Sequence, residues 1–286
     1  MTNIFSTFPA LFISLVGIIS LMIGSFLNVV IYRLPIMLKR SWRAECLEYL
    51  ELPEEPTETF NLSLPLSHCP CCKTPIKPYQ NIPVFSYLFL KGRCGSCQQP
   101  ISIRYPCIEA LTALLSVIVA SHFGYGVEAG FALLLTWLLV ALSFIDIDHQ
   151  LLPDNLTLPT LWLGLFLNLF DVYTSIESSV IGAIAGYLSL WTVFHLFKLV
   201  TGKEGMGYGD FKLLGVFGAW LGWQSLPLII LLSSLVGAII GLSMIVLVKH
   251  DKNKPIPFGP YLAIAGWIAL LWGNDINQLY LNTVGL

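Results

Sequence analysis

The sequence predicts an all-α integral membrane protein with about eight transmembrane helices and a small cytosolic insert that resembles a zinc ribbon. Apolar residues make up 56% of the 286 residues and charged residues only 11%, whereas a soluble domain carries about 25% charged residues. The mean hydropathy is +0.75. These values exclude an ordinary soluble enzyme and a disordered chain, and they predict a lipid bilayer as the surroundings. The net charge of −2 argues against a nucleic-acid partner, because such binding needs a basic face.

The fifteen Lys and Arg residues fall in three short regions, which orient the chain in the membrane. Nine lie between Arg33 and Arg104, and the next 93 residues contain no basic residue. The other six form two groups, namely Lys198, Lys203 and Lys212, then Lys249, Lys252 and Lys254. Because Lys and Arg concentrate in cytoplasmic loops, we expect all three regions to lie inside the cell.

Eight hydrophobic segments account for the membrane crossings, since a helix crosses a bilayer with about 20 apolar residues. The first, Ala10–Tyr32, is uncharged and is interpreted as a retained helix because it shows no clear cleavage site. The other segments are 106–123, 130–145, 156–170, 180–200, 211–223, 226–248 and 258–272. Eight crossings place both termini outside the cell and every basic region inside. Segment 211–223 is short, so it either tilts or enters the membrane without crossing it.

These segments predict three domains. Residues 1–32 form a first transmembrane helix, residues 33–104 form the cytosolic insert, and residues 105–286 form a polytopic membrane domain. The insert begins with an acidic stretch, for which a solvated surface is the expected role. Its glutamates are Glu45, Glu48, Glu51, Glu54, Glu55 and Glu58.

Two cysteine pairs in the insert have the spacing of metal-binding turns. Cys69 pairs with Cys72 and Cys94 with Cys97, and 21 residues separate the pairs. Four thiolates from two such turns can surround one Zn²⁺ tetrahedrally, and a site closed by four protein ligands is structural rather than catalytic. A cytosolic location disfavours two disulfides, whereas iron takes the same ligands and stays an alternative. Cys71 competes with Cys72, but only Cys72 keeps the two-residue spacer.

Four aspartates lie at predicted membrane boundaries, where ionisable groups are costly and usually functional. Asp146, Asp148 and Asp154 are at the cytoplasmic end of the third span, and Asp210 follows a glycine-rich turn at the entry to the sixth. All four therefore face the same side of the bilayer. Two carboxylates held close in a poorly solvated place share a proton, so that one can activate water while the other protonates an amide. This is the chemistry of aspartic proteolysis without a covalent intermediate.

The spacing alone leaves several roles open. It does not decide whether Asp146 or Asp148 partners Asp210. A structural role is favoured for Asp148 and Asp154, and Asp154 could cap the fourth helix. His149 could tune the aspartates, but a solvated loop residue is the simpler interpretation. An ion-coupled transporter would also use intramembrane aspartates, although it would place them at the midplane rather than at the cytoplasmic boundary.

Taken together, these residues resemble the type IV prepilin leader peptidase/N-methyltransferase family of bacteria, which are aspartic proteases with a Gly-x-Gly-Asp motif. The similarity runs from about residue 20 to residue 270. The matching segments are Gly24–Pro35, the four cysteines, Asn81–Pro83, Arg104–Glu109, Ile145–Asp154, Gly205–Leu214 and Pro257–Tyr261.

The resemblance implies a bifunctional inner-membrane enzyme. It would remove short basic leaders from type IV prepilins and type II secretion pseudopilins on the cytoplasmic side, after a glycine. The family motif assigns the catalytic dyad to Asp146 and Asp210. The resemblance also implies N-methylation of the new N-terminal residue with S-adenosylmethionine, an activity associated with the cysteine insert. No residue indicates a methyl-donor site by its own chemistry.

Overall fold

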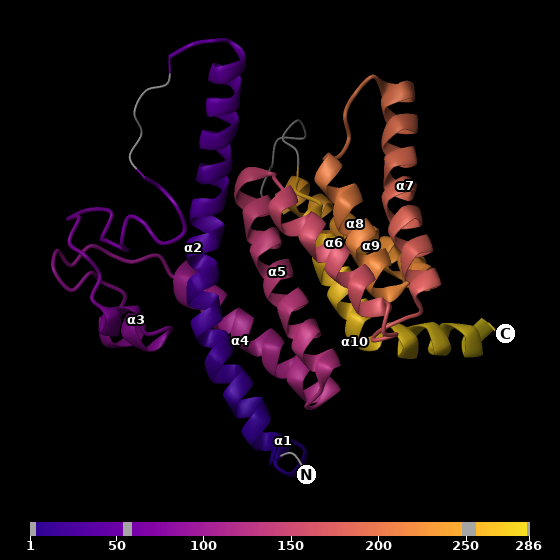
Figure 1. Ribbon diagram of the computed structural model, residues 1–286, viewed down its shortest axis with the longest axis horizontal. Helices are drawn as coiled ribbons and strands as arrows, with labels where there is room; N and C mark the ends of the chain where they lie inside the picture. Colours follow the sequence, from indigo (N-terminus) through magenta and orange to yellow (C-terminus); the bar gives the residue numbers. More distant parts are fainter. Residues whose placement is uncertain (1–3, 54–58, 248–255, 285–286) are drawn as a thin grey trace. The chain divides into compact units, whose positions relative to one another are not determined.

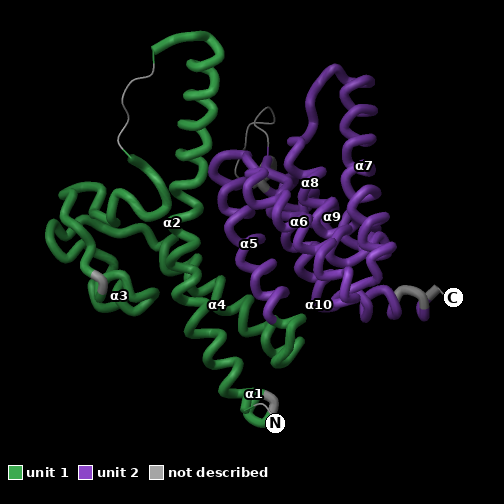
Figure 2. Tube along the Cα trace, viewed as in Figure 1, with its two compact units in different colours: residues 1–129 green, residues 130–286 purple. Residues whose placement is uncertain are grey.

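The computed structural model describes residues 4–53, 59–247 and 256–284, which form helices joined by turns and loops (Figure 1). The chain divides into two compact units, residues 1–129 and 130–286 (Figure 2). Among the described residues no β-strand occurs, so the all-α prediction is confirmed. Two predicted features lie outside the described ranges: the basic group Lys249, Lys252 and Lys254, and the glutamates Glu54, Glu55 and Glu58.

Two long helices form the framework of the first unit. A short helix, α1 (Ile4–Thr7), precedes α2 (Pro9–Tyr49), and α2 packs against α4 (Arg104–Phe123). In this interface the Asn28 amide donates hydrogen bonds to the carbonyl oxygens of Gly24 and Tyr105, both at 3.2 Å. Helix α2 continues well past Tyr32, where the sequence placed the end of the first span, so the beginning of the insert is helical.

The segment between α2 and α4 is fixed to these helices by two buried charged side chains. Its own helices are η1 (Pro78–Asn81) and α3 (Phe85–Phe89). Arg33 of α2 donates to the carbonyl oxygens of Asn61 at 2.9 Å and Pro65 at 2.6 Å. Glu109 of α4 accepts a hydrogen bond from the amide of Val84 at 2.7 Å. A buried charge is tolerated when it is hydrogen-bonded, and here each charge holds a loop in place.

The second unit is arranged around a short and mostly buried helix, α8. Its helices are α5 (Val127–His149, from residue 130 on), α6 (Asp154–Asn168), α7 (Ile176–Thr201), α8 (Tyr208–Leu221), η2 (Trp223–Ser225), α9 (Leu226–Leu247) and α10 (Gly259–Val284). Helix α8 contacts α6, α7, α9 and α10. The side chains of Phe211, Phe217 and Trp220 are fully buried. Because most residues of α8 are apolar and buried, it belongs inside a helix bundle rather than on its surface.

One buried amide ties three helices of this bundle together. Asn168, at the end of α6, donates from Nδ2 to the carbonyl oxygens of Ala219 at 2.9 Å and Trp220 at 3.1 Å in α8. Its Oδ1 accepts from the amides of Tyr173 at 3.0 Å and Thr174 at 3.2 Å, in the turn before α7. These bonds satisfy carbonyl groups at the end of α8 that have no partner within the helix.

Within the described residues, five helices are long and apolar enough to cross a membrane, as expected of a multi-pass membrane protein. They are Pro9–Tyr49, Arg104–Phe123, Val127–His149, Ile176–Thr201 and Trp223–Ser243. A helix satisfies its own backbone groups, which suits a lipid surrounding. Helices α6 and α8 have 15 and 14 residues, about 22 Å of helix at 1.5 Å per residue against a hydrocarbon core of about 30 Å. The count of eight crossings therefore stays a prediction.

Candidate functional site

Two buried aspartates lie in the second unit. Asp146 is in the last turn of α5 and is 6% exposed, and Asp210 is in the first turn of α8 and is 5% exposed. Asp148, only two residues after Asp146, is exposed. The fold thus distinguishes two aspartates that the spacing alone could not separate.

Each aspartate is held by the backbone amide of a glycine. Gly259, the first residue of α10, donates to Oδ2 of Asp146 at 3.0 Å. Gly207, the residue before α8, donates to Oδ2 of Asp210 at 3.2 Å, and the amide of Asp210 donates back to the carbonyl oxygen of Gly207 at 3.2 Å. Each carboxylate therefore has one oxygen bound by a backbone amide. The position of this donor does not depend on the rotamer of any neighbouring side chain.

Leu152 explains why two of the nearby residues are glycines. Its buried side chain packs against both Gly209, next to Asp210, and Gly259. A Cβ on Gly209 would lie 2.7 Å from Cβ of Leu152, and a Cβ on Gly259 would lie 2.7 Å from Oδ2 of Asp146. Both distances are shorter than carbon and oxygen atoms tolerate, so the turn after α5 can approach both aspartates only where side chains are missing.

The other polar residues of this region are more exposed to solvent than the two aspartates. Asp154 does not cap α6 as the sequence suggested, because Pro153 occupies the cap position and no side-chain cap bond forms. The Asp154 carboxylate instead accepts hydrogen bonds from Nζ of Lys212 at 2.6 and 2.8 Å, which links the first turn of α6 to α8. Asp154 therefore has a structural role, but through an ion pair with Lys212 and not through a helix cap. His149 is exposed, like Asp148.

The first unit contains the four cysteines of the predicted metal site. The sulfur atoms of Cys69, Cys72, Cys94 and Cys97 all lie within 4.8 Å of one another. Contacts of 3.8 Å between Cys69 and Cys97, and of 4.0 Å between Cys72 and Cys94, join the two turns. A tetrahedron of Zn–S bonds about 2.3 Å long has sulfur atoms about 3.8 Å apart. The donor set and its dimensions therefore fit a metal ion held by four thiolates.

Both cysteine turns have the same local structure. An isolated antiparallel bridge joins His68 to Pro75 around the first turn, and another joins Arg93 to Pro100 around the second. Hydrogen bonds between Cys72 and Thr74, chiefly the one to the Thr74 side chain, lower the pKa of Cys72 to about 6. The thiolate that metal binding requires is thus favoured at this position. Cys71 is exposed and is not a member of the cluster.

Known proteins similar to this chain share its whole length. The profile of the bacterial peptidase A24 N-terminal domain matches residues 18–123, and that of the type IV leader peptidase family matches residues 133–242. Relatives named prepilin leader peptidase/N-methyltransferase are 61% identical in Aeromonas salmonicida, 59% in Pseudomonas aeruginosa and 48% in Legionella pneumophila. These matches cover 96–97% of this chain and 96% of each relative. The chain belongs to the type IV leader peptidase family. No solved structure matches it.

The two family profiles separate the two sites. The A24 N-terminal profile spans all four cysteines, and the type IV leader peptidase profile spans Asp146 and Asp210. Gly259, whose amide holds Asp146, lies beyond both matched ranges. Membership of the family therefore agrees with the resemblance seen in the sequence, and it adds weight to the second unit as the peptidase part.

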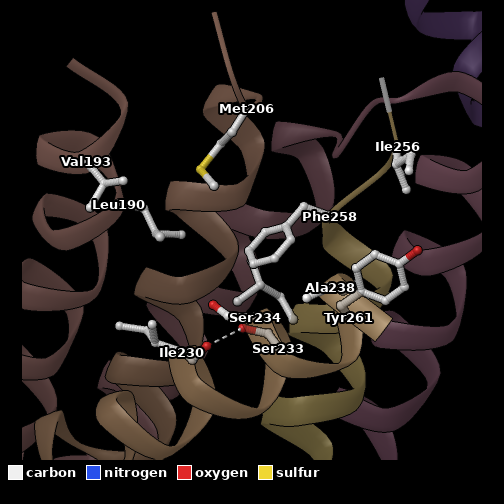
Figure 3. Close-up of a pocket in the computed structure, with 12 residues that line it drawn as sticks. Leu190, Val193, Met206, Ile230, Ser233, Ser234, Ala238, Ile256, Phe258 and Tyr261 are labelled. Carbon is white, nitrogen blue, oxygen red and sulfur yellow. Dashed lines mark hydrogen bonds between the residues drawn. The ribbon is translucent and has the colours of Figure 1, made fainter. Parts of the chain in front are cut away.

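The second unit also contains a cavity of about 490 Å³ (Figure 3). Its walls come from α7, α9 and the start of α10, with Leu190, Ala238 and Phe258 as examples. Met206, in the segment before α8, completes the lining. The cavity is lined by aliphatic and aromatic side chains with two serines.

Sequence reasoning missed three residues: Lys212, which pairs with Asp154, and Leu152 and Gly259, which lie at the buried aspartates. Lys212 was counted only as a basic residue, and its pairing with Asp154 joins positions far apart in the chain. Leu152 and Gly259 were quoted only as parts of matching segments. A glycine just after the Pro-Phe pair at 257–258 was the available signal, but its amide meets Asp146 only once α5 and α10 are packed together.

Proposed function

We propose that this chain is a bifunctional enzyme of the bacterial inner membrane. It cleaves the leader peptide from type IV prepilins and type II secretion pseudopilins, and it then methylates the new N-terminal residue with S-adenosylmethionine. Residues 1–32 are the first transmembrane helix, residues 33–104 the cysteine domain associated with methylation, and residues 105–286 the membrane peptidase. The names of the relatives support both activities.

One observation carries the peptidase proposal: Asp146 and Asp210 are both buried, and each is anchored by a glycine amide. A buried pair of carboxylates is expensive unless it has partners or a function. Their positions at the end of α5 and the start of α8 agree with the cytoplasmic boundary predicted from the basic residues. The second unit therefore contains the elements of an aspartic protease.

The pair would act as a general acid and a general base. Two carboxylates at close range hold one proton between them. The ionised member accepts a proton from water as the water attacks the peptide carbonyl carbon, and the protonated member donates to the carbonyl oxygen. As the C–N bond breaks, the proton taken from water passes to the leaving nitrogen, and one hydroxyl proton of the tetrahedral intermediate returns to the other carboxylate, which restores the shared proton. The Gly207 and Gly259 amides each bind one carboxylate oxygen, leaving the other oxygens for water and substrate.

The cysteine cluster would hold a zinc ion through Cys69, Cys72, Cys94 and Cys97. Such an ion, with all four positions taken by the protein, supplies structure rather than catalysis. The four sulfur atoms would bind it as thiolates, and the bridges that flank both turns would fix their spacing. The methylation half of the proposal rests on the relatives' names.

The decisive experiment incubates the purified protein with a prepilin and a labelled methyl donor, and scores cleavage and methylation separately. We expect both products from the wild-type protein. Cleavage without methylation would leave the peptidase proposal standing and remove the second activity. Failure to cleave any prepilin, with the protein folded in detergent or in membranes, would overturn the proposed function.

A further inference from the structure

The short helix α3 of the first unit has an exposed apolar face. Phe85, Leu88 and Phe89 are three and four residues apart, so they share one side of the helix. All three side chains are more than half exposed, and Phe89 is 86% exposed. On the other side of α3, the half-buried Tyr87 donates from its hydroxyl to the carbonyl oxygen of Ile101 at 3.4 Å. The fold therefore fixes one side of α3 and turns the apolar side outward.

The residues on either side of α3 extend this face and add positive charge. Tyr79 in η1 and Ile82 just after it are also exposed. Three exposed basic residues flank the two helices, namely Lys77, Lys91 and Arg93. The sequence contains no acidic residue between Glu58 and Glu109. Apolar and aromatic side chains bordered by cations are typical of a segment that enters the headgroup region of a bilayer containing anionic lipids.

One hydrogen bond places α3 at the depth of a membrane boundary. The amide of Val84, the residue before α3, donates to the buried carboxylate of Glu109 in α4 at 2.7 Å. Helix α4 has 20 residues and is apolar enough to cross a membrane. Its length, about 30 Å, only just equals the thickness of the hydrocarbon core. Arg104, its first residue, therefore lies at the boundary, and Glu109 lies about 7.5 Å further along the helix.

This depth suits lipid better than a soluble partner protein. Interfacial helices insert their apolar face about 5–10 Å into the boundary between headgroups and acyl chains, and the position of Val84 beside Glu109 falls in that range. In Figure 1, α3 lies near the level at which α4 crosses α2, far from the upper end of α2. A protein in the aqueous phase would meet lipid before it reached the face of α3.

We infer that α3 is an interfacial anchor: its apolar face inserts into the bilayer, and the flanking basic residues contact anionic lipid headgroups. The inference goes beyond the proposed activities and needs only that α2 and α4 cross the membrane. Cys94 of the cysteine cluster directly follows Arg93, one of the flanking basic residues. The anchor therefore holds the cysteine cluster at the membrane surface rather than free in the aqueous phase.

Photo-crosslinking from single positions of the full-length protein tests this anchor. Benzoylphenylalanine takes the place of Phe89, and the protein is irradiated in nanodiscs of phosphatidylethanolamine and phosphatidylglycerol at about three to one. Mass spectrometry then measures lipid adducts. The matched control carries the same group at Tyr49, which is 88% exposed at the far end of α2. Met22, which is 63% exposed within the first span, provides the yield expected in lipid.

We expect the Phe89 position to give a lipid yield close to that of the Met22 position. It should exceed the yield at Tyr49 by about tenfold or more, because the apolar face of an interfacial helix is buried among acyl chains. If the Phe89 protein does not fold, Leu88 on the same face takes its place. A yield no higher than at Tyr49 would overturn the anchor, and so would crosslinks made chiefly to a second copy of the chain or to an added prepilin.

The flanking cations are tested by the identity of the lipid adducts. In the wild-type background, phosphatidylglycerol should be enriched severalfold over its share of the bilayer, since each cation near an anionic surface favours binding. The combined variant Lys77→Gln, Lys91→Gln and Arg93→Gln should lose this enrichment and keep its total yield. Equal enrichment with and without the three charges would refute their contact with anionic headgroups. Leader cleavage does not enter these measurements, so failure of the anchor leaves the proposed function standing, and failure of cleavage leaves the anchor standing.

Discussion

The cysteine cluster of the first unit and the aspartate pair of the second are built in opposite ways. Each cysteine turn is local, since Cys69 and Cys72 are separated by two residues and a bridge between His68 and Pro75 encloses them. The aspartate pair is assembled from the end of α5 and the start of α8, and it is anchored by the start of α10. A local turn specifies its own geometry, whereas a site made from three helices depends on how those helices pack.

This difference also predicts how each site fails. Removing one sulfur atom from the cysteine cluster leaves the turns in place but breaks a closed coordination shell. Changing the packing around the aspartates shifts groups that must stay within hydrogen-bonding distance of the substrate. We therefore expect the aspartate site to be sensitive to substitutions at residues with no chemistry of their own, and the cysteine site to be sensitive at its ligands alone.

The largest effect should come from the aspartates themselves. Asp146→Asn or Asp210→Asn removes an acid or base, so the rate of leader cleavage should fall by a factor on the order of 10²–10⁴. The measurement is conversion of a prepilin by purified protein, with thermal unfolding as the check on folding. Asp148→Asn, an exposed neighbour, is the matched control and should retain cleavage. Normal cleavage by either of the first two variants would disprove the dyad.

The next effect concerns the metal. Cys69→Ser or Cys94→Ser should reduce bound zinc from about one ion per chain to nearly none, because a structural site needs all four ligands. Elemental analysis of the purified protein measures this, and a lower unfolding temperature should accompany the loss. Cys71→Ser, at the exposed cysteine beside the cluster, should keep its metal. A wild-type protein without zinc or iron would refute the site.

A smaller effect is expected from a methyl group added near the aspartates. Gly259→Ala would place a Cβ 2.7 Å from Oδ2 of Asp146. Such overpacking lowers the stability of the fold by about 1–3 kcal/mol. Cleavage should slow by about tenfold or more, while metal content stays unchanged. Gly130→Ala in α5, where a Cβ meets nothing within 4 Å, serves as the control. Equal rates for the two variants would show that the Asp146 anchor does not matter for cleavage.

The smallest effect should come from the ion pair between Lys212 and Asp154. Its side chains are 27% and 53% exposed, so solvent screens the pair and its coupling should be about 0.2–1 kcal/mol. A double-mutant cycle with Lys212→Met and Asp154→Asn, read from unfolding by denaturant, measures this value. Cleavage should persist in both variants. A loss of activity as deep as that of Asp210→Asn would show that Lys212 takes part in the chemistry.

The sequence by itself determined the class of the protein and the composition of its two sites. Low charge and long apolar segments require helices in a bilayer, because lipid offers no partner for a free backbone group. The paired spacing of Cys69 with Cys72 and of Cys94 with Cys97 specifies four ligands in two local turns. The motif ending at Asp210 predicts its role through family resemblance, and Asp210 lies within the range that the leader peptidase profile matches.

Only the tertiary structure decided which groups surround the aspartates. It buries Asp146 and leaves Asp148 exposed, and it brings the Gly259 amide to Asp146 from more than a hundred residues away. It also inserts Leu152 between two glycines and pairs Asp154 with Lys212 instead of capping a helix. Spacing along one chain describes neighbours within a turn or a helix, and these contacts depend instead on the packing of α5, α6, α8 and α10.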